Sequence, residues 1–433
     1  MVTRNGAVRI NRLTIALGSF ALLATTPAPA QFRGDEPMAV PRAVRQGIDF
    51  VYVDPQMSSV ARKRQRPQNW LARALSFDSA ASRAGAPNRM FADLARGLQQ
   101  YQLGWGRLPQ VKVPAGAALK RGASGKRVAL LRTRLGLAPG GGYDDQLSSV
   151  VANYQRVHAL GTADGIAGAA TVASLNRGAL YYQRKIAINM ERAYRLPAVR
   201  SFDRYVVVDS GAAETYLVDR DKVVDRMRVI VGSAQTKTPM MAVLMRNAKA
   251  NPYWHVPPEL VRSLTAKKVK ELGPSYFDDF HYEILSDWSG NGRPVDPKSI
   301  NWKAIASGKT RPNFMVRQLP GPWNSMGAMK FEMPNDFGIY LHDTPLKEKF
   351  AGDRWISNGC VRLEDYRRFG SWVFGRMPEP GPVPEQVIPL PRAVPVYMTY
   401  LTVAPVDGGV MFRPDPYGFD ALAMPQMFSG GRV

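Results

Sequence analysis

The sequence contains one cysteine and four histidines among its 433 residues. A single thiol cannot form an internal disulfide, so no disulfide framework can stabilise this chain. The cysteine and the scattered histidines also lack the spacing of a zinc site, and we expect neither a metal nor a cofactor. Acidic residues are few as well, with 35 Asp and Glu against 58 Lys and Arg. These absences direct attention to the lone thiol of Cys360.

The first 30 residues have the pattern of a secretory signal peptide. Arginines precede an apolar run from Leu13 to Thr25, and small residues lead up to Ala30. The run has 13 residues, fewer than the roughly 18 of a membrane-spanning helix, so we expect cleavage after Ala30 and no stable transmembrane anchor. No cysteine near Ala30 could carry a lipid. The mature chain is therefore expected to be exported.

The net charge is +23, and removing the three signal arginines leaves +20. A charge of this size suggests a polyanionic partner or surface. Because the protein is expected outside the cytoplasm, anionic cell-wall polymers or lipid headgroups fit better than nucleic acid, and we expect no nucleic-acid partner. The alternative is that scattered basic residues only keep the protein soluble.

The composition, with 45% hydrophobic residues, allows two or three globular domains. Residues 31–113 are rich in Ala and Arg and show no recognisable chemistry. Within them, a helical period over 90–102 places Phe91, Leu94 and Leu98 on one face. We interpret 31–113 as a helical and partly disordered scaffold region.

Three short helical patterns follow in residues 117–176, and a helical connector is expected over 177–201. The segments "NYQRVHAL" and "DGIAGAAT" in the first of these regions resemble the peptidoglycan-binding domain of many cell-wall enzymes. A helical spacer without a ligand would show the same apolar pattern, so that interpretation stays open. His158 is interpreted as a structural residue rather than a ligand.

From residue 202 the sequence becomes rich in Val, Tyr and Ile, with Gly, Pro and Asp between the apolar runs. We predict a mainly β domain over 202–374, a barrel or a sandwich, with further strands and a tail in 375–433. The segment 258–312 opens with a helical pattern and continues through loop-like sequence containing Trp288 and Trp302. We interpret it as an insertion that acts as a lid. The predicted fold class is multidomain α+β.

His342 is the histidine best placed to serve Cys360, since it precedes the cysteine by 18 residues in "IYLHDTP". In a strand, Tyr340 and His342 would share one face. A nearby imidazole would lower the thiol pKa and accept its proton. Gly359 permits a tight turn in which the N–H groups of Gly359 and Cys360 face an oxyanion, and Asp343 could orient the imidazole. The alternative is a packed cysteine with an unrelated histidine.

The segments "YLHDTP" and "SNGCVRL" resemble the active-site signature of the L,D-transpeptidases with a YkuD-type catalytic domain. The segments "VGSAQTKTP", "NPYWHVP" and "RQLPGPWNSMGAMKFEMPN" also match the pattern of the larger, multidomain periplasmic members. The resemblance extends over residues 103–420. It implies a soluble enzyme of the periplasm of a Gram-negative bacterium.

The resemblance implies that Cys360 is the nucleophile and His342 the base. The residues that it implies around them frame or line the site: Ser357, Gly359, Arg362, Tyr340, Asn324 and Trp323. Many relatives have histidine where this chain has Asn358. The resemblance therefore does not fix the geometry of the oxyanion loop at this position.

The implied substrates are peptidoglycan stem peptides, one as donor and one as acceptor. Cys360 would attack the carbonyl of the third stem residue, release the terminal D-alanine and form a thioester, from which an acceptor amine would take the acyl group to give a 3–3 cross-link. Water as acceptor would make the enzyme a carboxypeptidase, and a protein amine would make it an anchoring enzyme. A wall-binding protein whose catalytic domain has decayed and a purely hydrolytic cysteine peptidase are two rival hypotheses. The resemblance also implies acylation by carbapenems.

Overall fold

The computed structural model describes residues 50–54, 57, 87–289 and 291–428 of the chain, all of them within the unit Met38–Val433. The predicted signal peptide lies outside the described residues. In the part that the structure describes, no helix combines the length and the apolar character needed to cross a membrane.

Eight strands between residues 204 and 399 close into a barrel. They are β2 Arg204–Asp209, β3 Glu214–Asp219, β4 Lys222–Gly232, β5 Met241–Ala250, β9 Met329–Glu332, β10 Leu341–His342, β12 Val361–Leu363 and β13 Gln386–Thr399. The order is β5-β13-β2-β3-β4-β12-β10-β9, and β9 pairs back with β5 to close the ring. The short strands β1 (Val51–Tyr52) and β11 (Trp355–Ser357) add to β5 and β4. The prediction of an α+β protein with a barrel-like β domain is confirmed.

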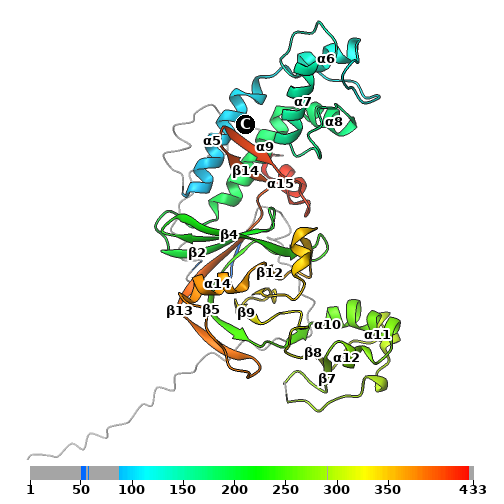
Figure 1. Ribbon diagram of the computed structural model, residues 1–433, viewed down its shortest axis with the longest axis vertical. Coiled ribbons are helices and arrows are strands. Elements are labelled where there is room, and N and C mark those ends of the chain that lie inside the picture. Colours follow the sequence, from blue (N-terminus) through cyan, green and yellow to red (C-terminus); the bar gives the residue numbers. More distant parts are fainter. Residues whose placement is uncertain (1–49, 55–56, 58–86, 290, 429–433) are drawn as a thin grey trace, which may run out of the picture. The chain divides into compact units, whose positions relative to one another are not determined.

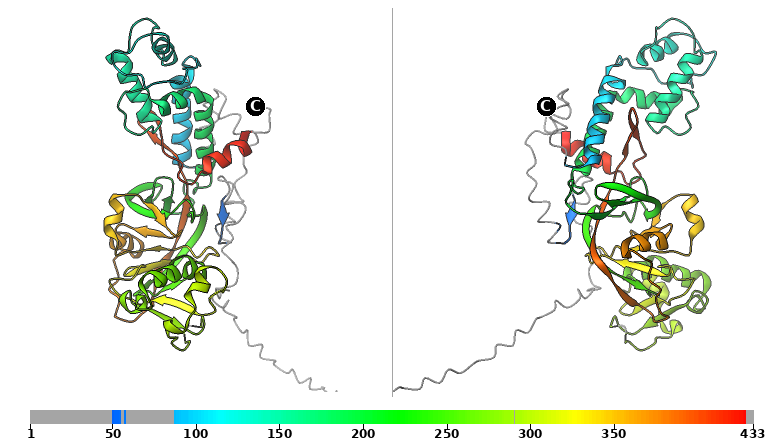
Figure 2. Two further views of the ribbon diagram at one scale, coloured as in Figure 1. Left: turned by 90° about the vertical axis from the view of Figure 1, so that its right-hand side faces the viewer. Right: turned by 60° about the vertical axis from the view of Figure 1, so that its left-hand side comes forward.

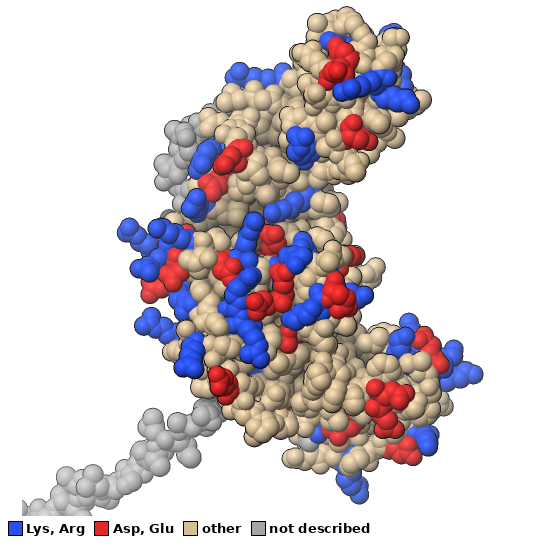
Figure 3. All heavy atoms as spheres, viewed as in Figure 1, with Lys and Arg blue, Asp and Glu red and all other residues tan. Residues whose placement is uncertain are grey.

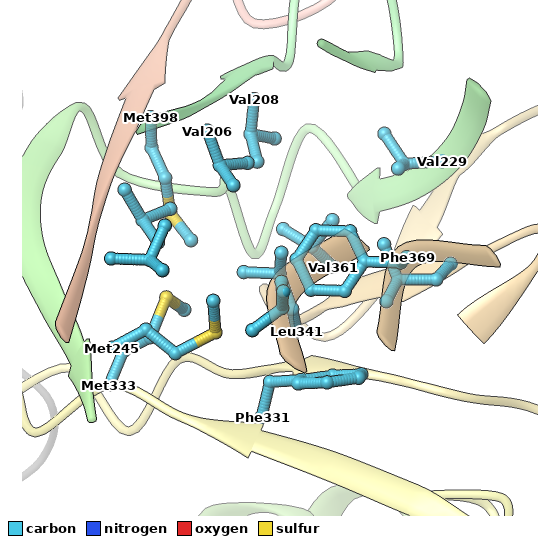
Figure 4. Close-up of a cluster of buried hydrophobic side chains, with 14 of the residues drawn as sticks. Val206, Val208, Val229, Met245, Phe331, Met333, Leu341, Val361, Phe369 and Met398 are labelled. Atoms are coloured by element: carbon cyan, nitrogen blue, oxygen red, sulfur yellow. The ribbon is translucent and has the colours of Figure 1, made fainter. Parts of the chain in front are cut away.

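Apolar side chains fill the barrel because successive residues of each strand point to opposite faces. Figure 4 shows side chains from different strands meeting inside, among them Val206, Met245, Leu341 and Met398. The helix α14 (Tyr366–Phe374) contributes Phe369, whose ring meets that of Phe331 at 4.8 Å between centroids. The polar residues that alternate with this core therefore lie on the outside of the barrel.

The segment between β5 and β9 folds around a hydrophobic core of its own. It contains a three-stranded sheet of β6 (Trp254–Val256), β8 (Met315–Gln318) and β7 (Tyr282–Leu285). Its helical turns are α10 Pro258–Leu260, η2 Val261–Thr265, α11 Ala266–Leu272, α12 Tyr276–Asp279, η3 Pro297–Ser299 and α13 Trp302–Ala306. Since β6 and β8 belong to the sheet, the insertion is wider than the predicted 258–312. We refer to residues 254–318 as the insertion subdomain.

A second core joins helices from before the barrel to strands from after it. The helices α5 (Arg89–Leu103) and α9 (Ala179–Tyr194) lie side by side in Figures 1 and 2, with η1 (Trp105–Arg107) following α5. They pack with the hairpin of β14 (Val403–Val406) and β15 (Gly409–Phe412). The helix predicted over 90–102 is confirmed. Of the strands in 375–433, β13 belongs to the barrel, whereas β14 and β15 form a separate two-stranded sheet.

The last helix, α15 (Phe419–Phe428), is held by buried charges. The Asp420 carboxylate forms ion pairs with Arg192 at 2.6 Å and with Lys185 at 3.2 Å. Arg192 and Asp420 are almost completely buried. Burial alone would raise the pKa of Asp420, but the charges of Arg192 and Lys185 and the hydrogen bonds to the carboxylate together outweigh it and lower the pKa. The start of α15 is thereby tied to α9.

Residues 119–175 enclose a smaller core between α6 (Lys126–Arg134), α7 (Asp145–Val157) and α8 (Ala169–Arg177). Asp144 caps α7 by accepting a hydrogen bond from the Leu147 N–H at 2.8 Å. His158, just after α7, is buried, and it makes hydrogen bonds to the Tyr154 carbonyl and the Tyr101 hydroxyl. These contacts are consistent with a structural His158.

Basic and acidic side chains are interspersed over the face shown in Figure 3. Several basic residues of the barrel are paired: Arg228 with Glu364, and Arg368 with Asp225 at 3.0 Å. On this face the positive charge does not form one uninterrupted patch.

Candidate active site

The outer face of β9, β10 and β12 carries the chemically active side chains. His342 on β10 lies directly opposite Lys330 on β9 and Arg362 on β12. Directly paired residues point to the same side of a sheet. Leu341 and Val361, which are also paired, point into the barrel core, so the row of Lys330, His342 and Arg362 faces outward.

Cys360 immediately precedes β12 and continues this outward face. The Val361 N–H donates to the Tyr340 carbonyl at 2.9 Å, which extends the pairing of β10 and β12 by one step. Alternation along both strands then places Tyr340 and Cys360 on the same side as His342 and Arg362. The predicted shared face of Tyr340 and His342 is consistent with this register.

His342 is 3% exposed, and its Nδ1 lies 2.5 Å from the carbonyl oxygen of Asp343. A carbonyl can only accept, so Nδ1 carries the proton of the neutral ring and Nε2 holds the lone pair. Burial lowers the pKa of His342 to about 3, and the charge of Arg362 acts in the same direction. The imidazole is therefore neutral near pH 7.

The Cys360 thiol is partly buried, and its Sγ lies 3.6 Å from the Gly338 carbonyl oxygen. Burial raises the pKa of the thiol above its usual value. A hydrogen bond from the backbone of Tyr340 and the charges of Arg362 and Lys330 oppose this rise. At rest the thiol and the imidazole, which share the outward face, are thus both neutral. The thiol donates to Gly338 rather than to His342, so proton transfer requires it to leave that carbonyl.

The loop before Cys360 is ordered by Ser357. Its hydroxyl donates to the Cys360 carbonyl at 2.6 Å and accepts from the Gly359 N–H at 3.1 Å. This corrects the expectation that the Gly359 N–H faces an oxyanion, because that donor is already used. Within the described residues the Cys360 N–H has no hydrogen-bond partner, and it is the donor that remains for an oxyanion. Asn358 is exposed at the tip of this loop.

A second loop, Gly232–Thr238, holds the Cys360 loop from behind. The Thr238 hydroxyl donates to the Gly359 carbonyl at 2.7 Å, and the Thr236 hydroxyl donates to the Ser357 carbonyl at 2.8 Å. Gly359 has φ of 115°, in the region that favours glycine, and a Cβ there would meet Ile339 at 2.9 Å. A Cβ on Gly232 would lie 2.0 Å from the Thr236 carbonyl oxygen, so the close turn of this second loop also requires glycine.

Asp343 orients His342 through its main chain. Its carboxylate is engaged elsewhere, with Oδ1 at 2.7 Å from the Lys347 ammonium and Oδ2 accepting the Ala328 N–H at 2.9 Å. Lys347 begins the short helix η4 (Lys347–Ala351). The carboxylate therefore links β10 to its neighbouring loops and does not contact the imidazole.

Asn324 is completely buried and does not line the site as expected. Its amide donates to the carbonyls of Gln318 and Leu319, and its Oδ1 accepts the Met326 N–H at 2.7 Å. It shapes the segment 319–328 that connects the insertion subdomain to β9. Trp323 is exposed, and its ring stacks on His281 of that subdomain at 3.7 Å between centroids.

Tyr340 and Arg362 remain candidates for substrate contact. The Lys330 ammonium lies 4.5 Å from the centre of the Tyr340 ring, and burial raises the pKa of Tyr340 to about 12. The Nε of Arg362 is buried, and it makes no hydrogen bond to the described part of the chain. A substrate carbonyl or carboxylate could satisfy this donor.

Sequence reasoning missed Lys330 and the threonines of the second loop. Lys330 could have been noticed as a cation within the apolar alternation of "AMKFEM". The segment "VGSAQTKTP" was recognised as a family pattern, but its hydroxyl groups received no role. No group of three or more His, Cys, Asp or Glu side chains that could hold a metal occurs among the described residues.

Residues 203–383 match the family model of YkuD, the L,D-transpeptidase catalytic domain. A Haemophilus influenzae protein provisionally named an L,D-transpeptidase is 31% identical over 247 residues, which cover 55% of this chain and 48% of that protein. The chain thus matches about half the length of this curated relative.

Among solved structures, a cysteine-to-serine mutant of the Enterococcus faecium L,D-transpeptidase has 15% sequence identity and a TM-score of 0.23, over 46% of this chain and 50% of that chain. The Mycobacterium smegmatis L,D-transpeptidase has 12% identity and a TM-score of 0.23, over 45% of this chain and 58% of that chain.

Proposed function

Because residues 203–383 form an L,D-transpeptidase catalytic domain of the YkuD family, we propose that the protein forms 3–3 cross-links between peptidoglycan stem peptides through a thioester on Cys360. The observation that carries this proposal is the shared outward face of Cys360 and His342, with the lone pair of the imidazole on Nε2. Nucleophilic acyl transfer needs a nucleophile and a general base that can take its proton.

In the acylation step, Nε2 of His342 takes the proton of the Cys360 thiol as Sγ attacks the carbonyl carbon of the third stem residue. The Cys360 N–H stabilises the resulting oxyanion, and Arg362 and Lys330 stabilise negative charge on sulfur. The C–N bond to the terminal D-alanine then breaks. The imidazolium returns its proton to the leaving amine, which departs as free D-alanine and leaves a thioester.

In the second step, the amine of an acceptor stem attacks the thioester carbonyl and loses a proton to His342. The C–S bond breaks, the sulfur regains a proton from the imidazolium, and a new amide remains between the two stems. Water in place of the amine would release the shortened stem, and a protein amine would attach that protein to the wall.

The decisive experiment incubates the protein with purified disaccharide tetrapeptides and analyses the products by mass spectrometry. We expect cross-linked dimers that have lost one D-alanine per bond formed. Cys360→Ala should give none while unfolding at the same temperature as the wild type. Shortened monomers without dimers would instead identify a carboxypeptidase, and turnover by the folded Cys360→Ala variant would contradict the role of the thiol.

The same thioester chemistry implies acylation by carbapenems. We expect intact-protein mass spectrometry to show one adduct per chain, on the peptide that contains Cys360, since the chain has no second thiol. An adduct that persists in Cys360→Ala would place the reaction elsewhere. Cys360→Ser is the matched control, because serine keeps the shape of the side chain but is a far weaker nucleophile.

We further propose that the protein acts in the periplasm and that residues 117–176 bind peptidoglycan. These residues lie outside the family match. They enclose a separate core, so surface changes there need not disturb the barrel. The full chain should sediment with purified sacculi at a salt concentration that screens charges beyond roughly 8–10 Å. Loss of binding at moderate salt would show that the chain is held only by non-specific charge attraction.

A further inference from the structure

The loop that shapes the Cys360 turn is itself held from the C-terminal part of the chain. Tyr417 lies between β15 and α15, beyond the residues of the family match. Its hydroxyl donates to the Gly232 carbonyl at 2.6 Å and accepts the Thr238 N–H at 3.3 Å. One phenol thus bridges both ends of the Gly232–Thr238 loop.

Two further bonds carry this bridge to the nucleophile. The Thr238 hydroxyl accepts the Gly232 N–H at 2.9 Å and donates to the Gly359 carbonyl at 2.7 Å. That carbonyl belongs to the peptide group whose N–H is contributed by Cys360, the donor left for the oxyanion. A rotation of this peptide plane would move both the carbonyl and the N–H, so the Thr238 bond sets the direction of the N–H.

Tyr417 is well placed to keep this arrangement rigid. It is 3% exposed and stacks on the Tyr400 ring, with 5.0 Å between centroids and 13° between planes. The Tyr400 hydroxyl accepts the Tyr417 N–H at 3.0 Å and donates to Asp415 at 2.6 Å. Burial raises the pKa of Tyr417 to about 12, so its phenol stays protonated and able to donate at neutral pH.

We propose that Tyr417 is a positioning residue for the L,D-transpeptidase reaction, acting through Thr238 on the Cys360 peptide. The proposal rests on the proposed function for its kinetic readout. It assigns part of the active-site geometry to a segment outside the family match. If Tyr417 served only to stack on Tyr400, its hydroxyl would have no effect on catalysis.

The test replaces Tyr417 by phenylalanine, which keeps the ring and removes only the hydroxyl. We expect kcat for D-alanine release to fall about tenfold, less than the ~10²–10³ for direct loss of an oxyanion donor, with KM changed less than twofold. A lower kcat with nearly unchanged KM would indicate misplacement of the reacting groups, whereas a higher KM with unchanged kcat would indicate loss of substrate binding. The pH profile of Cys360 alkylation by iodoacetamide should shift as well, and this readout does not depend on the proposed activity.

Tyr143→Phe is the matched control, because it removes a buried hydroxyl that donates to the Gly165 carbonyl at 2.7 Å, in the small helical core and away from Tyr417 and the Gly232–Thr238 loop. Both variants should lose some thermal stability, but Tyr143→Phe should retain kcat. Wild-type kcat in Tyr417→Phe would overturn the proposal. An equal loss of kcat in both variants would overturn it too, since the effect would then come from lost stability rather than from the position of the Cys360 peptide. Absence of D-alanine release in the wild type, with the alkylation shift present, would contradict the proposed function and leave the positioning intact.

Discussion

Thr238 and Gly359 are joined by a 2.7 Å hydrogen bond, although 121 positions separate them in the chain. Thr238→Val keeps the shape of this buried side chain and removes the bond to the Gly359 carbonyl. We expect kcat for D-alanine release to fall by about tenfold or more, because the Cys360 N–H would no longer be aimed at the oxyanion. Steady-state kinetics on a tetrapeptide substrate would measure the change.

Thr215→Val provides the control for this variant. Thr215 is also completely buried in the barrel, and its hydroxyl donates to the Val207 carbonyl at 3.1 Å on the neighbouring strand β2. Both substitutions should cost about 1 kcal/mol of unfolding free energy. Only Thr238→Val should change kcat, and an equal loss in Thr215→Val would attribute the effect to stability.

The pH dependence of Cys360 alkylation follows from the two pKa shifts. Burial raises the pKa of Cys360 and lowers that of His342 to about 3. The thiolate is the reactive form, so the iodoacetamide rate should keep rising with pH beyond the ordinary thiol range. Arg362→Met should raise the thiol pKa further, whereas Arg362→Lys should preserve it in part.

Intact-protein mass spectrometry at a series of pH values would follow this reaction, since the chain has no other thiol. A rate plateau reached below pH 7 would contradict the neutral resting pair, because it would indicate a thiolate–imidazolium pair.

Replacing Asp343 by asparagine separates the two roles of that residue. The carbonyl that orients His342 is unchanged, while the pairing of the carboxylate with Lys347 is lost. We expect kcat to fall less than about fivefold, in contrast to the ~10⁴-fold loss when a triad carboxylate is replaced. Thermal unfolding and steady-state kinetics should therefore show a larger effect on stability than on turnover. A loss of several orders of magnitude would show that the carboxylate acts on the imidazole during catalysis.

The lid hypothesis can be tested through Trp302 in the core of the insertion subdomain. Its ring packs near Phe277 and Phe314, and Trp302→Ala should destabilise that core by about 3–5 kcal/mol. If the subdomain covers bound stems, KM should rise severalfold while iodoacetamide still reaches Cys360 at the wild-type rate. Trp105→Ala is the control that should leave KM unchanged, because Trp105 packs against the second core, formed by α5, α9 and the β14–β15 hairpin. An unchanged KM in Trp302→Ala would count against a lid.

Acid should destabilise the protein through its buried neutral histidines. Burial lowers the pKa of His158 to about 3, so below the ordinary value of about 6.5 the unfolded chain binds a proton that the folded chain excludes. Stability therefore falls as the pH drops from 6.5 toward 3, by about 1.4 kcal/mol per pH unit for each such histidine. His342 contributes in the same direction.

His158→Phe tests this effect, because phenylalanine can occupy the stack between Tyr154 and Phe412. The variant should be less stable at pH 7, having lost two hydrogen bonds, but its stability should fall less steeply between pH 6.5 and 5. Urea unfolding followed by circular dichroism at several pH values would measure both. Equal slopes for the two proteins would show that His158 is protonated in the folded state.

Local patterns in the sequence predicted the strands and the outward face of Tyr340 and His342, since alternation depends only on neighbouring residues. The predicted limits of the insertion, 258–312, were too narrow. The short strands β6 and β8 lie outside them, and they pair with each other from opposite ends of the insertion. Asn324 was expected to contact substrate, yet its polar atoms close a buried turn. Tyr417 could not be predicted, because its partner Gly232 is 185 positions away. Such long-range contacts depend on the closed barrel rather than on any local motif.

The barrel closes through the antiparallel pairing of β5 with β9, and the insertion subdomain lies between these two strands in the chain. Ala250, the last residue of β5, pairs directly with Met329, the first residue of β9. The chain therefore leaves and re-enters the barrel at adjacent points, and the entire insertion subdomain is the loop of a β-hairpin. The entropy of closing such a loop rises only with the logarithm of its length. A longer segment at this seam therefore adds little to the entropic cost of closing the barrel, so the insertion subdomain can be exchanged while the barrel and the Cys360 loop keep their geometry.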